Sequence, residues 1–323
     1  MQATLKLAAI ALAIAPGSAL AFSDFNGDGR SDVLWRNSYS GANVIWYSAN
    51  SATPQMLSAV SNFDWLVVGN GDYDGDGRAD LLWRNRRTGA NGIWRSGSSL
   101  TPQAVTTVSN VDWYVAGSGD YNGDGKADIL WRNIRTGANV IWRSANSATP
   151  QGVFAVKPFV GWRVAGSGDY NGDGISDILW RNSSGANVIW RSANWASRQA
   201  VASVTNPAWE IVGSGDYNGD GKSDILWRNY NTGANTIWRS ANATTQQAVT
   251  PVSFLGWHAA ASGDYDGDGT SDILWRNCGD GTNRIWRSAN SATQLVVTTV
   301  SDFSWVIINP DVPDFSGVGC WDY

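Results

Sequence analysis

The sequence predicts an all-β fold, a β-propeller of six four-stranded blades closed by the C-terminal strand. Two observations lead to this prediction. A nine-residue loop rich in Asp and Gly recurs six times, at intervals of 47 to 49 residues, and four short strand-like segments fall within each interval. Four short strands in a repeat of roughly 40–50 residues are typical of propeller blades.

Residues 1–21 have the three-part order of a secretory signal peptide. Lys6 precedes an apolar run from residue 7 to residue 15, and Ala19-Leu20-Ala21 is a small-residue cleavage site. We therefore expect cleavage near Ala21 and a secreted protein, extracellular or periplasmic. No later stretch approaches the roughly 20 apolar residues of a membrane span, so none is expected.

The recurring loop resembles a cation site. In residues 120–128, positions 1, 3, 5 and 9 carry carboxylate or amide oxygens, position 7 offers a backbone carbonyl, and glycines at positions 4 and 6 allow a tight curl. Ca²⁺ takes six to eight oxygen ligands at about 2.3–2.6 Å. Position 12 is Trp131, where an EF-hand loop has Glu, so this loop opens a strand rather than a helix.

All six loops offer the same set of ligands. The repeats start 24, 72, 120, 169, 216 and 264, and together they hold 20 aspartates whose mutual repulsion favours bound ions. We expect about six structural Ca²⁺ ions. The predicted metal ligands are Asp24, Asn26, Asp28, Arg30, Asp32, Asp72, Asp74, Asp76, Arg78, Asp80, Asp120, Asn122, Asp124, Lys126, Asp128, Asp169, Asn171, Asp173, Ile175, Asp177, Asp216, Asn218, Asp220, Lys222, Asp224, Asp264, Asp266, Asp268, Thr270 and Asp272.

The four segments of a repeat fall at residues 113–117, 129–133, 139–143 and 103–108. The first repeat lacks its own copy of the first segment, whereas the chain ends with a spare copy at Trp305. We therefore expect the last strand to complete the first blade, which removes the exposed edges of an open sheet. The predicted domain is a single propeller over residues 22–309.

Residues 310–323 are expected to form a C-terminal clasp. Their segment from Asp314 to Asp322 resembles a seventh cation loop in which Val318 replaces the position 5 ligand. Seven blades therefore remain the alternative. The two cysteines, Cys278 and Cys320, are expected to form a disulfide in an exported protein, with two free thiols as the alternative.

The run Gly-Ser-Gly-Asp-Tyr-Asn-Gly-Asp-Gly-Lys-Ser-Asp-Ile-Leu-Trp, residues 213–227, and its five relatives resemble the FG-GAP/VCBS repeat family of calcium-loop propellers, in its secreted bacterial form. That family includes the integrin α-subunit head and some fungal lectins. The resemblance implies Ca²⁺ between the first and second strands of each blade, an extracellular setting, and ligand binding commonly on the face opposite the loops. Family members often have seven blades, and six departs from that number.

Eighteen of the 20 tryptophans occupy three repeat positions. Packing between blades is the first expectation for them. The alternative is that one class lines sugar-binding clefts between blades, since aromatic faces near Arg and Asn suit pyranose rings; these are Trp46, Trp94, Trp142, Trp190, Trp238 and Trp286. Trp195 falls outside the pattern and is an exposed candidate.

Two further positions repeat. Each Trp-Arg-Asn triplet places an Arg, such as Arg84, which we expect to pair with loop aspartates or to stack on Trp. The residue after the first-segment Trp varies, which predicts an exposed rim that could carry specificity; it is Leu66, Tyr114, Arg163, Glu210, His258 or Val306.

The composition excludes some functions. A net charge of −5 with no basic patch argues against nucleic acid. The chain has one His and one Glu, and its other acids lie mostly in the cation loops, so acid/base catalysis lacks partners. We expect a non-catalytic binding or adhesion module, lectin-like, with a glycan as the favoured partner. A protein-binding module of the integrin-head type is the first alternative, and a carbohydrate-active enzyme is the second.

Overall fold

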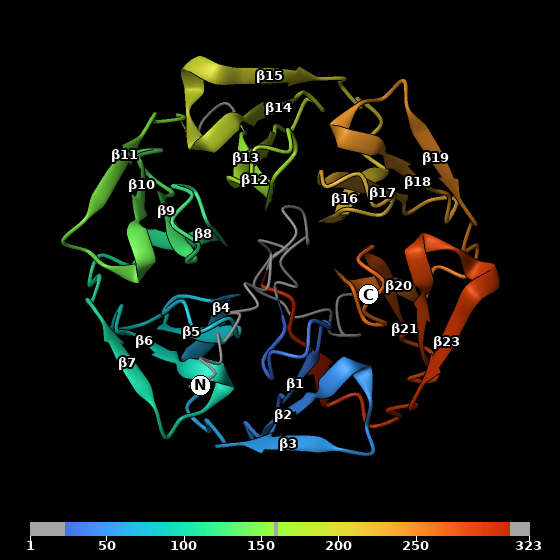
Figure 1. Ribbon diagram of the computed structural model, residues 1–323, viewed down its shortest axis with the longest axis horizontal. Helices are drawn as coiled ribbons and strands as arrows, with labels where there is room; N and C mark the ends of the chain where they lie inside the picture. The colour runs from blue at the N-terminus through green and yellow to red at the C-terminus, as the bar shows by residue number, and fades with distance from the viewer. Residues whose placement is uncertain (1–22, 158–160, 311–323) are drawn as a thin grey trace, which may run out of the picture.

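The computed structural model describes residues 23–157 and 161–310. They form a closed ring of six blades around a central axis (Figure 1), and each blade is a four-stranded antiparallel sheet. The prediction of six blades is therefore confirmed, and the alternative of seven is wrong. Apart from short 3-10 turns, the described residues contain no helix.

The strands follow one order from the axis outward. The innermost strands of blades 1 to 6 are β24 (Trp305–Ile307), β4 (Trp65–Gly71), β8 (Trp113–Gly119), β12 (Arg163–Gly168), β16 (Trp209–Gly215) and β20 (Trp257–Gly263). The second strands are β1 (Val33–Asn37), β5 (Asp80–Asn85), β9 (Asp128–Asn133), β13 (Asp177–Arg181), β17 (Asp224–Asn229) and β21 (Asp272–Asn277).

The two outer positions are equally regular. The third strands are β2 (Asn43–Trp46), β6 (Asn91–Trp94), β10 (Asn139–Trp142), β14 (Asn187–Trp190), β18 (Asn235–Trp238) and β22 (Asn283–Trp286). The outermost strands are β3 (Pro54–Leu57), β7 (Pro102–Val105), β11 (Pro150–Val153), β15 (Arg198–Val201), β19 (Gln246–Val249) and β23 (Gln294–Val297).

The ring closes as predicted. Strand β24 pairs antiparallel with β1, with Trp305 opposite Asn37 and Ile307 opposite Trp35. The C-terminal strand thus supplies the innermost strand that the first repeat lacks. Both ends of the described chain are held in blade 1, so every blade has its full set of four strands.

The core lies between the blades. Ile129, Leu130 and Trp131 on β9 are adjacent in sequence and each is at most 1% exposed. Because neighbouring residues of a strand face opposite sides of the sheet, both faces of each blade must be covered. Packing of one blade on the next provides this cover, and the cluster that joins blade 6 to blade 1 includes Leu274 and Trp35.

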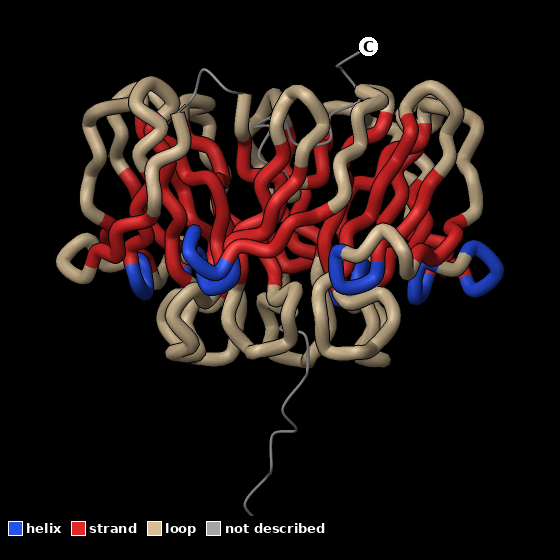
Figure 2. Tube along the Cα trace, turned by 90° about the horizontal axis from the view of Figure 1, so that it is seen from above, coloured by secondary structure: helices blue, strands red, loops and turns tan. Residues whose placement is uncertain are grey.

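The third and fourth segments differ from their predicted extents. Strand β10 ends at Trp142 because a 3-10 turn begins at the next residue, and strand β7 ends at Val105 rather than at residue 108. The turns lie toward one face of the ring (Figure 2). They are η1 (Tyr47–Ala49), η2 (Arg95–Gly97), η3 (Arg143–Ala145), η5 (Arg191–Ala193), η7 (Arg239–Ala241) and η8 (Arg287–Ala289), with η6 (Trp195–Ser197) and η9 (Ser291–Thr293) following two of them.

These turns carry an unusual backbone. In η3, Ser144 and Ala145 have φ values of 47° and 58°, in the left-handed region that favours glycine. The same pair is left-handed in all six blades, and in η2 the second residue is Gly97. The sequence therefore gave little signal of this turn, since Ser and Ala are not typical left-handed residues.

Several predictions fall outside the described residues. These are the signal peptide over residues 1–21, cleavage near Ala21, and almost all of the C-terminal clasp with its loop-like segment and Cys320. They stay predictions, as does the disulfide between Cys278 and Cys320. Within residues 23–157 and 161–310, no helix has the length and apolar character needed to cross a membrane.

Candidate cation loops and an interblade groove

In blades 2 to 6 each predicted cation loop connects the innermost strand to the second strand, and in blade 1 the loop leads directly into the second strand, β1. The loops therefore gather on one face of the ring, on the same side as the 3-10 turns (Figure 2). In blade 3, Gly123 and Gly125 have φ values of 76° and 81°. A side chain would be strained at these angles, which explains why glycine recurs at both positions.

The first aspartate of each loop is held by backbone amides. In blade 3, Oδ1 of Asp120 accepts from the amides of Gly123 and Asp124 at 2.7 and 3.2 Å, and Oδ2 accepts from Gly125 at 2.8 Å. The same contacts recur in the other five loops. The loop thus curls around this carboxylate through its own backbone hydrogen bonds.

The ninth residue is a buried aspartate at the junction of loop, strand and 3-10 turn. One oxygen of Asp128 accepts from the amide of Tyr121 at 3.0 Å, and the other accepts from Ser144 in η3 at 2.8 Å. Asp128 is 0% exposed. Burial raises its pKa to about 6, and it raises the pKa to about 7 at the equivalent Asp32, Asp80, Asp177, Asp224 and Asp272.

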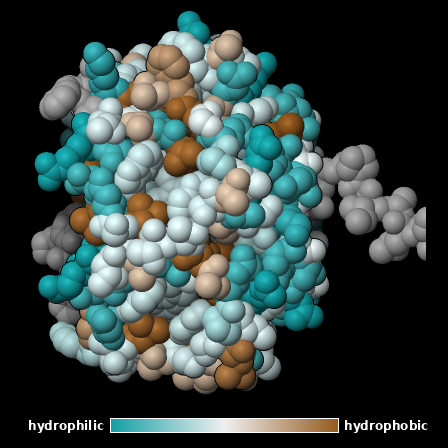
Figure 3. All heavy atoms as spheres, turned by 90° about the vertical axis from the view of Figure 1, so that its left-hand side faces the viewer, coloured by the Kyte–Doolittle hydropathy of each residue, from teal (hydrophilic) through white to brown (hydrophobic). Residues whose placement is uncertain are grey.

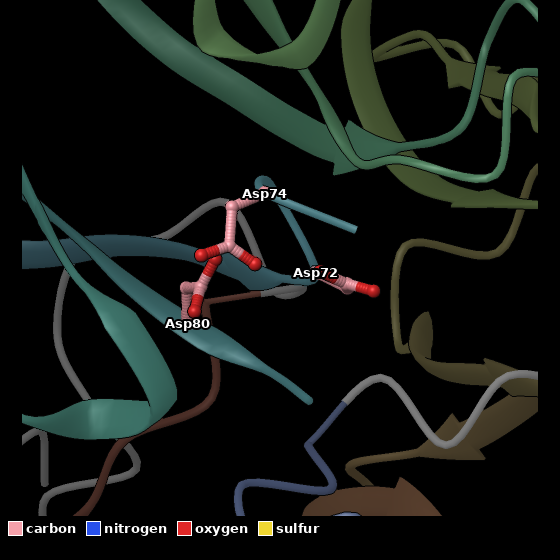
Figure 4. Close-up of side chains that lie close together, drawn as sticks. All are labelled: Asp72, Asp74 and Asp80. Atoms are coloured by element: carbon pink, nitrogen blue, oxygen red, sulfur yellow. The ribbon is translucent and has the colours of Figure 1, made fainter. Parts of the chain in front are cut away.

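The third and fifth residues complete the set of side-chain donors. Ligand atoms of Asp72, Asp74 and Asp80 lie within 4.8 Å of one another, and the carboxylates of Asp74 and Asp80 face each other (Figure 4). In blade 6 the cluster is Asp264, Asp266 and Asp268. The other four loops have Asn at position 3, which donates to the position 5 carboxylate at 3.0–3.1 Å.

These donors fit a calcium ion. Oxygens bound to one Ca²⁺ at about 2.3–2.6 Å are at most about 5 Å apart, which agrees with the separation in the blade 2 cluster. The carboxylates that accept amide hydrogen bonds keep further lone pairs for a metal, and such bonds orient ligating carboxylates. The chemistry of the donor set, carboxylate and amide oxygens without nitrogen or sulfur, is that of a hard cation.

The six loops are also joined to one another. The amide of Ser176, at position 8 in blade 4, donates to the carbonyl of Asp120 in blade 3 at 2.7 Å. Equivalent hydrogen bonds of 2.6 Å link the remaining five pairs of neighbouring loops. One of them joins Ser31 of blade 1 to Asp264 of blade 6. The first ligand of one loop is thus fixed beside the last ligand of the next, all the way around the ring.

The tryptophans considered as sugar ligands lie at the ends of the third strands. Trp142 packs against Trp131 of its own blade with ring centroids 5.0 Å apart, and the corresponding pairs recur in all six blades at 4.8–5.0 Å. Trp190 and Trp238 are buried, and the other four are half-buried. Packing accounts for their recurrence, and their role as ligand residues stays a prediction.

The Arg of each Trp-Arg-Asn triplet joins neighbouring blades. Arg132 is 2% exposed and its guanidinium lies 4.9 Å from the ring centre of Trp180 in the next blade. It also donates to Asn139 and to the carbonyls of Val156 and Trp162 at 3.0–3.2 Å. Stacking on Trp is therefore confirmed. These hydrogen bonds go to the end of the blade away from the loops, so the expected pairing with loop aspartates is wrong.

The Arg–Trp contacts form a complete circuit. The guanidinium carbons lie 4.9–5.1 Å from the tryptophan of the following blade at all six interfaces, and Arg276 of blade 6 stacks on Trp35 of blade 1. The six triplets therefore have a structural role in holding the ring together.

The variable position is less exposed than predicted. Its side chain lies opposite the triplet Arg in the blade, as Leu66 lies opposite Arg84. Only Arg163 is exposed at this position, whereas His258 is buried and the others are half-buried. The expectation of an exposed rim is therefore wrong for five of the six blades, because these side chains pack beside the buried guanidinium.

A groove lies between the outer parts of blades 2 and 3, and the sequence did not reveal it. Its volume is about 690 Å³. Strand β7 forms one wall, and the cation loop and η3 of blade 3 form the other. The lining is mostly polar: Gln103, Ala104, Thr106, Asn122, Asp124, Arg143, Ser144, Ala145, Asn146, Ser147 and Thr149. Trp142 is not among these residues. The recurring polar residues, rather than the tryptophans, are the part of the repeat that could have indicated the groove.

The architecture defines a class: a repeat-built β-propeller whose blades each open with an Asp-Gly loop. Comparison with known families makes the assignment more specific. The FG-GAP-like repeat matches residues 24–83, 72–131, 120–180, 169–227 and 216–275, so the chain belongs to the FG-GAP repeat family.

The chain was also compared with solved structures, of which one supports the same kind of fold. The chain is similar to a chain in the crystal structure of a nidogen/laminin complex, with 11% identity, 80% of this chain and 89% of that chain covered, and a TM-score of 0.52. A structure of BBS1N in complex with ARL6DN gives 12% identity, 89% and 84% coverage, and a TM-score of 0.48. A catalytically inactive virginiamycin B lyase from Staphylococcus aureus gives 8%, 75%, 73% and 0.45. No curated protein matches the sequence.

Proposed function

We propose that this protein is a secreted, calcium-binding propeller that acts as a non-catalytic, lectin-like module for binding glycans. The interblade groove is the observation that carries the proposal. Its amide, hydroxyl, carboxylate and guanidinium groups offer both donors and acceptors, which is the combination that sugar hydroxyls require. A scaffold of FG-GAP repeats is consistent with a binding module.

Calcium in the loops would support this groove directly. Asp124 belongs to the donor set of the blade 3 loop and also lines the groove. Ser144 lines the groove as well, and its amide binds Asp128 of the same loop. An ion that fixes the two carboxylates therefore fixes one wall of the groove, so glycan binding should depend on Ca²⁺.

The groove residues recur around the ring, which favours several weak sites acting together. Arg143 has an Arg counterpart in four other blades and Tyr47 in blade 1, and Asn146 has an Asn counterpart in all blades except blade 2. Repeated sites on one rigid scaffold can raise the overall affinity for a branched or surface-bound glycan well above that of a single site.

A protein partner is the second candidate, and a different surface favours it. Phe63, Val111, Ile134, Phe254 and Leu255 are large apolar residues that are 38–61% exposed. They lie in the connections at the face opposite the cation loops. Exposed apolar residues gathered on one face are typical of protein-binding surfaces. The fold relative in a nidogen/laminin complex is a structure with a protein partner.

A glycan array probed with the mature protein separates these functions. We expect binding to a subset of glycans in excess Ca²⁺, loss of that binding in EDTA, and recovery when Ca²⁺ is restored. Binding to no glycan under any condition would refute the proposed function and favour the protein partner. Release of shorter sugars from a bound polysaccharide would instead show an enzyme. N-terminal sequencing of protein from the culture medium tests secretion, with Phe22 expected as the first residue.

A further inference from the structure

Two of the six blade interfaces differ from the other four at the outer rim, and one of these two is aromatic. At four interfaces, a hydroxyl at the end of the outermost strand bonds a hydroxyl of the next blade at 2.5–2.7 Å; the pairs are Ser58–Ser99, Thr106–Ser147, Thr250–Ser291 and Thr298–Ser51. Between blades 4 and 5 the equivalent residues are Ala202 and Ala243. Between blades 3 and 4 they are Phe154 and Trp195.

These two side chains form the centre of an aromatic cluster. The rings of Phe154 and Trp195 are stacked, with centroids 5.3 Å apart and planes 16° from parallel. Trp190 meets Trp195 edge-on at 5.4 Å, and the guanidinium of Arg198 lies 4.1 Å from the Trp195 ring centre. We call Phe154, Trp190, Trp195 and Arg198 the aromatic platform.

The platform remains open to solvent although its rings are fixed by one another. Phe154 is 57% exposed and Trp195 is 38% exposed. The Phe154 ring also meets Trp190 edge-on at 6.3 Å, and because more than half of the residue is exposed it leaves apolar surface at the rim. The side of the ring drawn in Figure 3 carries hydrophilic and neutral surface with separate hydrophobic spots.

Blade 4 has the same polar residues near the platform as blade 3 has in the groove between blades 2 and 3. Arg191 donates to Gln199 at 2.7 Å, as Arg143 does to Gln151 in blade 3. Asn194 and Asp173 stand at the repeat positions of Asn146 and Asp124, which line the groove between blades 2 and 3. An apolar ring face next to fixed hydrogen-bonding groups matches the two surfaces of a pyranose, its C–H face and its hydroxyls.

We propose that the aromatic platform is the principal sugar subsite of the protein, where a pyranose stacks on Phe154 and its hydroxyls reach Arg191 and Asn194. This inference rests on the proposed glycan function and deepens it. The interface between blades 3 and 4 is then the dominant site, and the polar grooves at the other interfaces are weaker sites. The platform residues would set which sugar is preferred.

One double variant tests this inference, and a second double variant is its matched control. Phe154→Thr with Trp195→Ser installs the hydroxyl pair that the neighbouring interface uses, so the fold and the interblade contact should be kept. Thr250→Ala with Ser291→Ala, the matched control, alters the equivalent pair between blades 5 and 6, which lies outside the groove between blades 2 and 3. Each is titrated calorimetrically with the strongest glycan from the array, in excess Ca²⁺, and its calcium-dependent melting temperature is recorded.

We expect the first variant to bind at least tenfold more weakly, and the control to bind within twofold of the wild type. Both should keep the melting temperature of the wild type within about 3 °C. Equal affinity of wild type and Phe154→Thr/Trp195→Ser would overturn the platform while leaving the glycan function in place, and so would an equal loss in the control. If the wild-type protein binds no glycan, both the glycan function and the sugar subsite are overturned. If it binds a protein ligand instead and the platform variant loses that binding, the aromatic platform is a protein-docking site.

Discussion

Removal of Ca²⁺ should destabilise the propeller more strongly at pH 8 than at pH 5. In the ion-free chain, burial raises the pKa of the ninth loop aspartate to about 7 in five blades, as in Asp80, and to about 6 for Asp128. The ordinary value is 3.8. The folded state therefore binds these protons more tightly than the unfolded state. The stability that protonation contributes is complete below about pH 4 and is lost as the pH rises through 7.

The size of the effect follows from the same values. Each pH unit between the folded and unfolded pKa is worth about 1.4 kcal/mol, so one buried carboxylate costs about 4 kcal/mol at pH 8 relative to pH 4. The equivalent carboxylates in the other five blades destabilise the ion-free fold in the same direction. Bound Ca²⁺, which needs the ionised carboxylate, offsets this cost and binds more tightly as the pH rises.

The assay is thermal unfolding followed by tryptophan fluorescence from pH 5 to pH 8. Metal-free protein is prepared with EDTA at pH 8 and freed of chelator by gel filtration, and each sample is measured with and without excess Ca²⁺. We expect the ion-free melting temperature to fall as the pH rises and the gain from Ca²⁺ to widen. An ion-free melting temperature that rises with pH, or a calcium gain equal at pH 5 and pH 8, would refute the reasoning.

Three further predictions concern single contacts. Asp120→Asn should lower the bound calcium from about six ions to about five per chain by elemental analysis, whereas Asp112→Asn, which breaks only an exposed pair with Arg135, should leave the count unchanged; equal counts would contradict the loop assignment. Arg132→Ala should cost about 3 kcal/mol in urea unfolding through lost stacking and unpaired carbonyls, against less than about 1 for the exposed Arg143→Ala. Because backbone hydrogen bonds join neighbouring loops, calcium titration curves should be steeper than those of independent sites. A curve that fits six independent sites would exclude coupling between the loops.

The architecture could be predicted from the sequence because the same loop and strand pattern occurs six times. The spacing of the loops fixed the blade size, and the spare segment at Trp305 fixed the closure, which β24 confirms by pairing with β1. The role of Trp131 in packing could also be expected, since its neighbours Ile129 and Leu130 demanded cover on both faces of the strand. Local chemistry and periodicity were sufficient for these features.

Features that depend on contacts between blades could not be read from the chain. Arg132 appeared able to pair with loop aspartates, but it lies at the other end of the blade, where its partners are carbonyls of the following connection. The groove is built from β7 and η3, which belong to different repeats. The left-handed conformation of Ser144 is not typical of serine, and its backbone amide donates to Asp128, a residue 16 positions earlier in the chain, so the turn depends on a contact that the local sequence does not indicate.

The most direct test of the account is a crystal structure of the mature protein with Ca²⁺ and the strongest glycan from the array. We predict ions in the loops, each between carboxylates such as Asp120 and Asp128, and sugar density at the outer rim between blades, stacked on Phe154. Sugar density on the face opposite the loops or at the central axis would contradict the account, as would loops without ions in excess Ca²⁺.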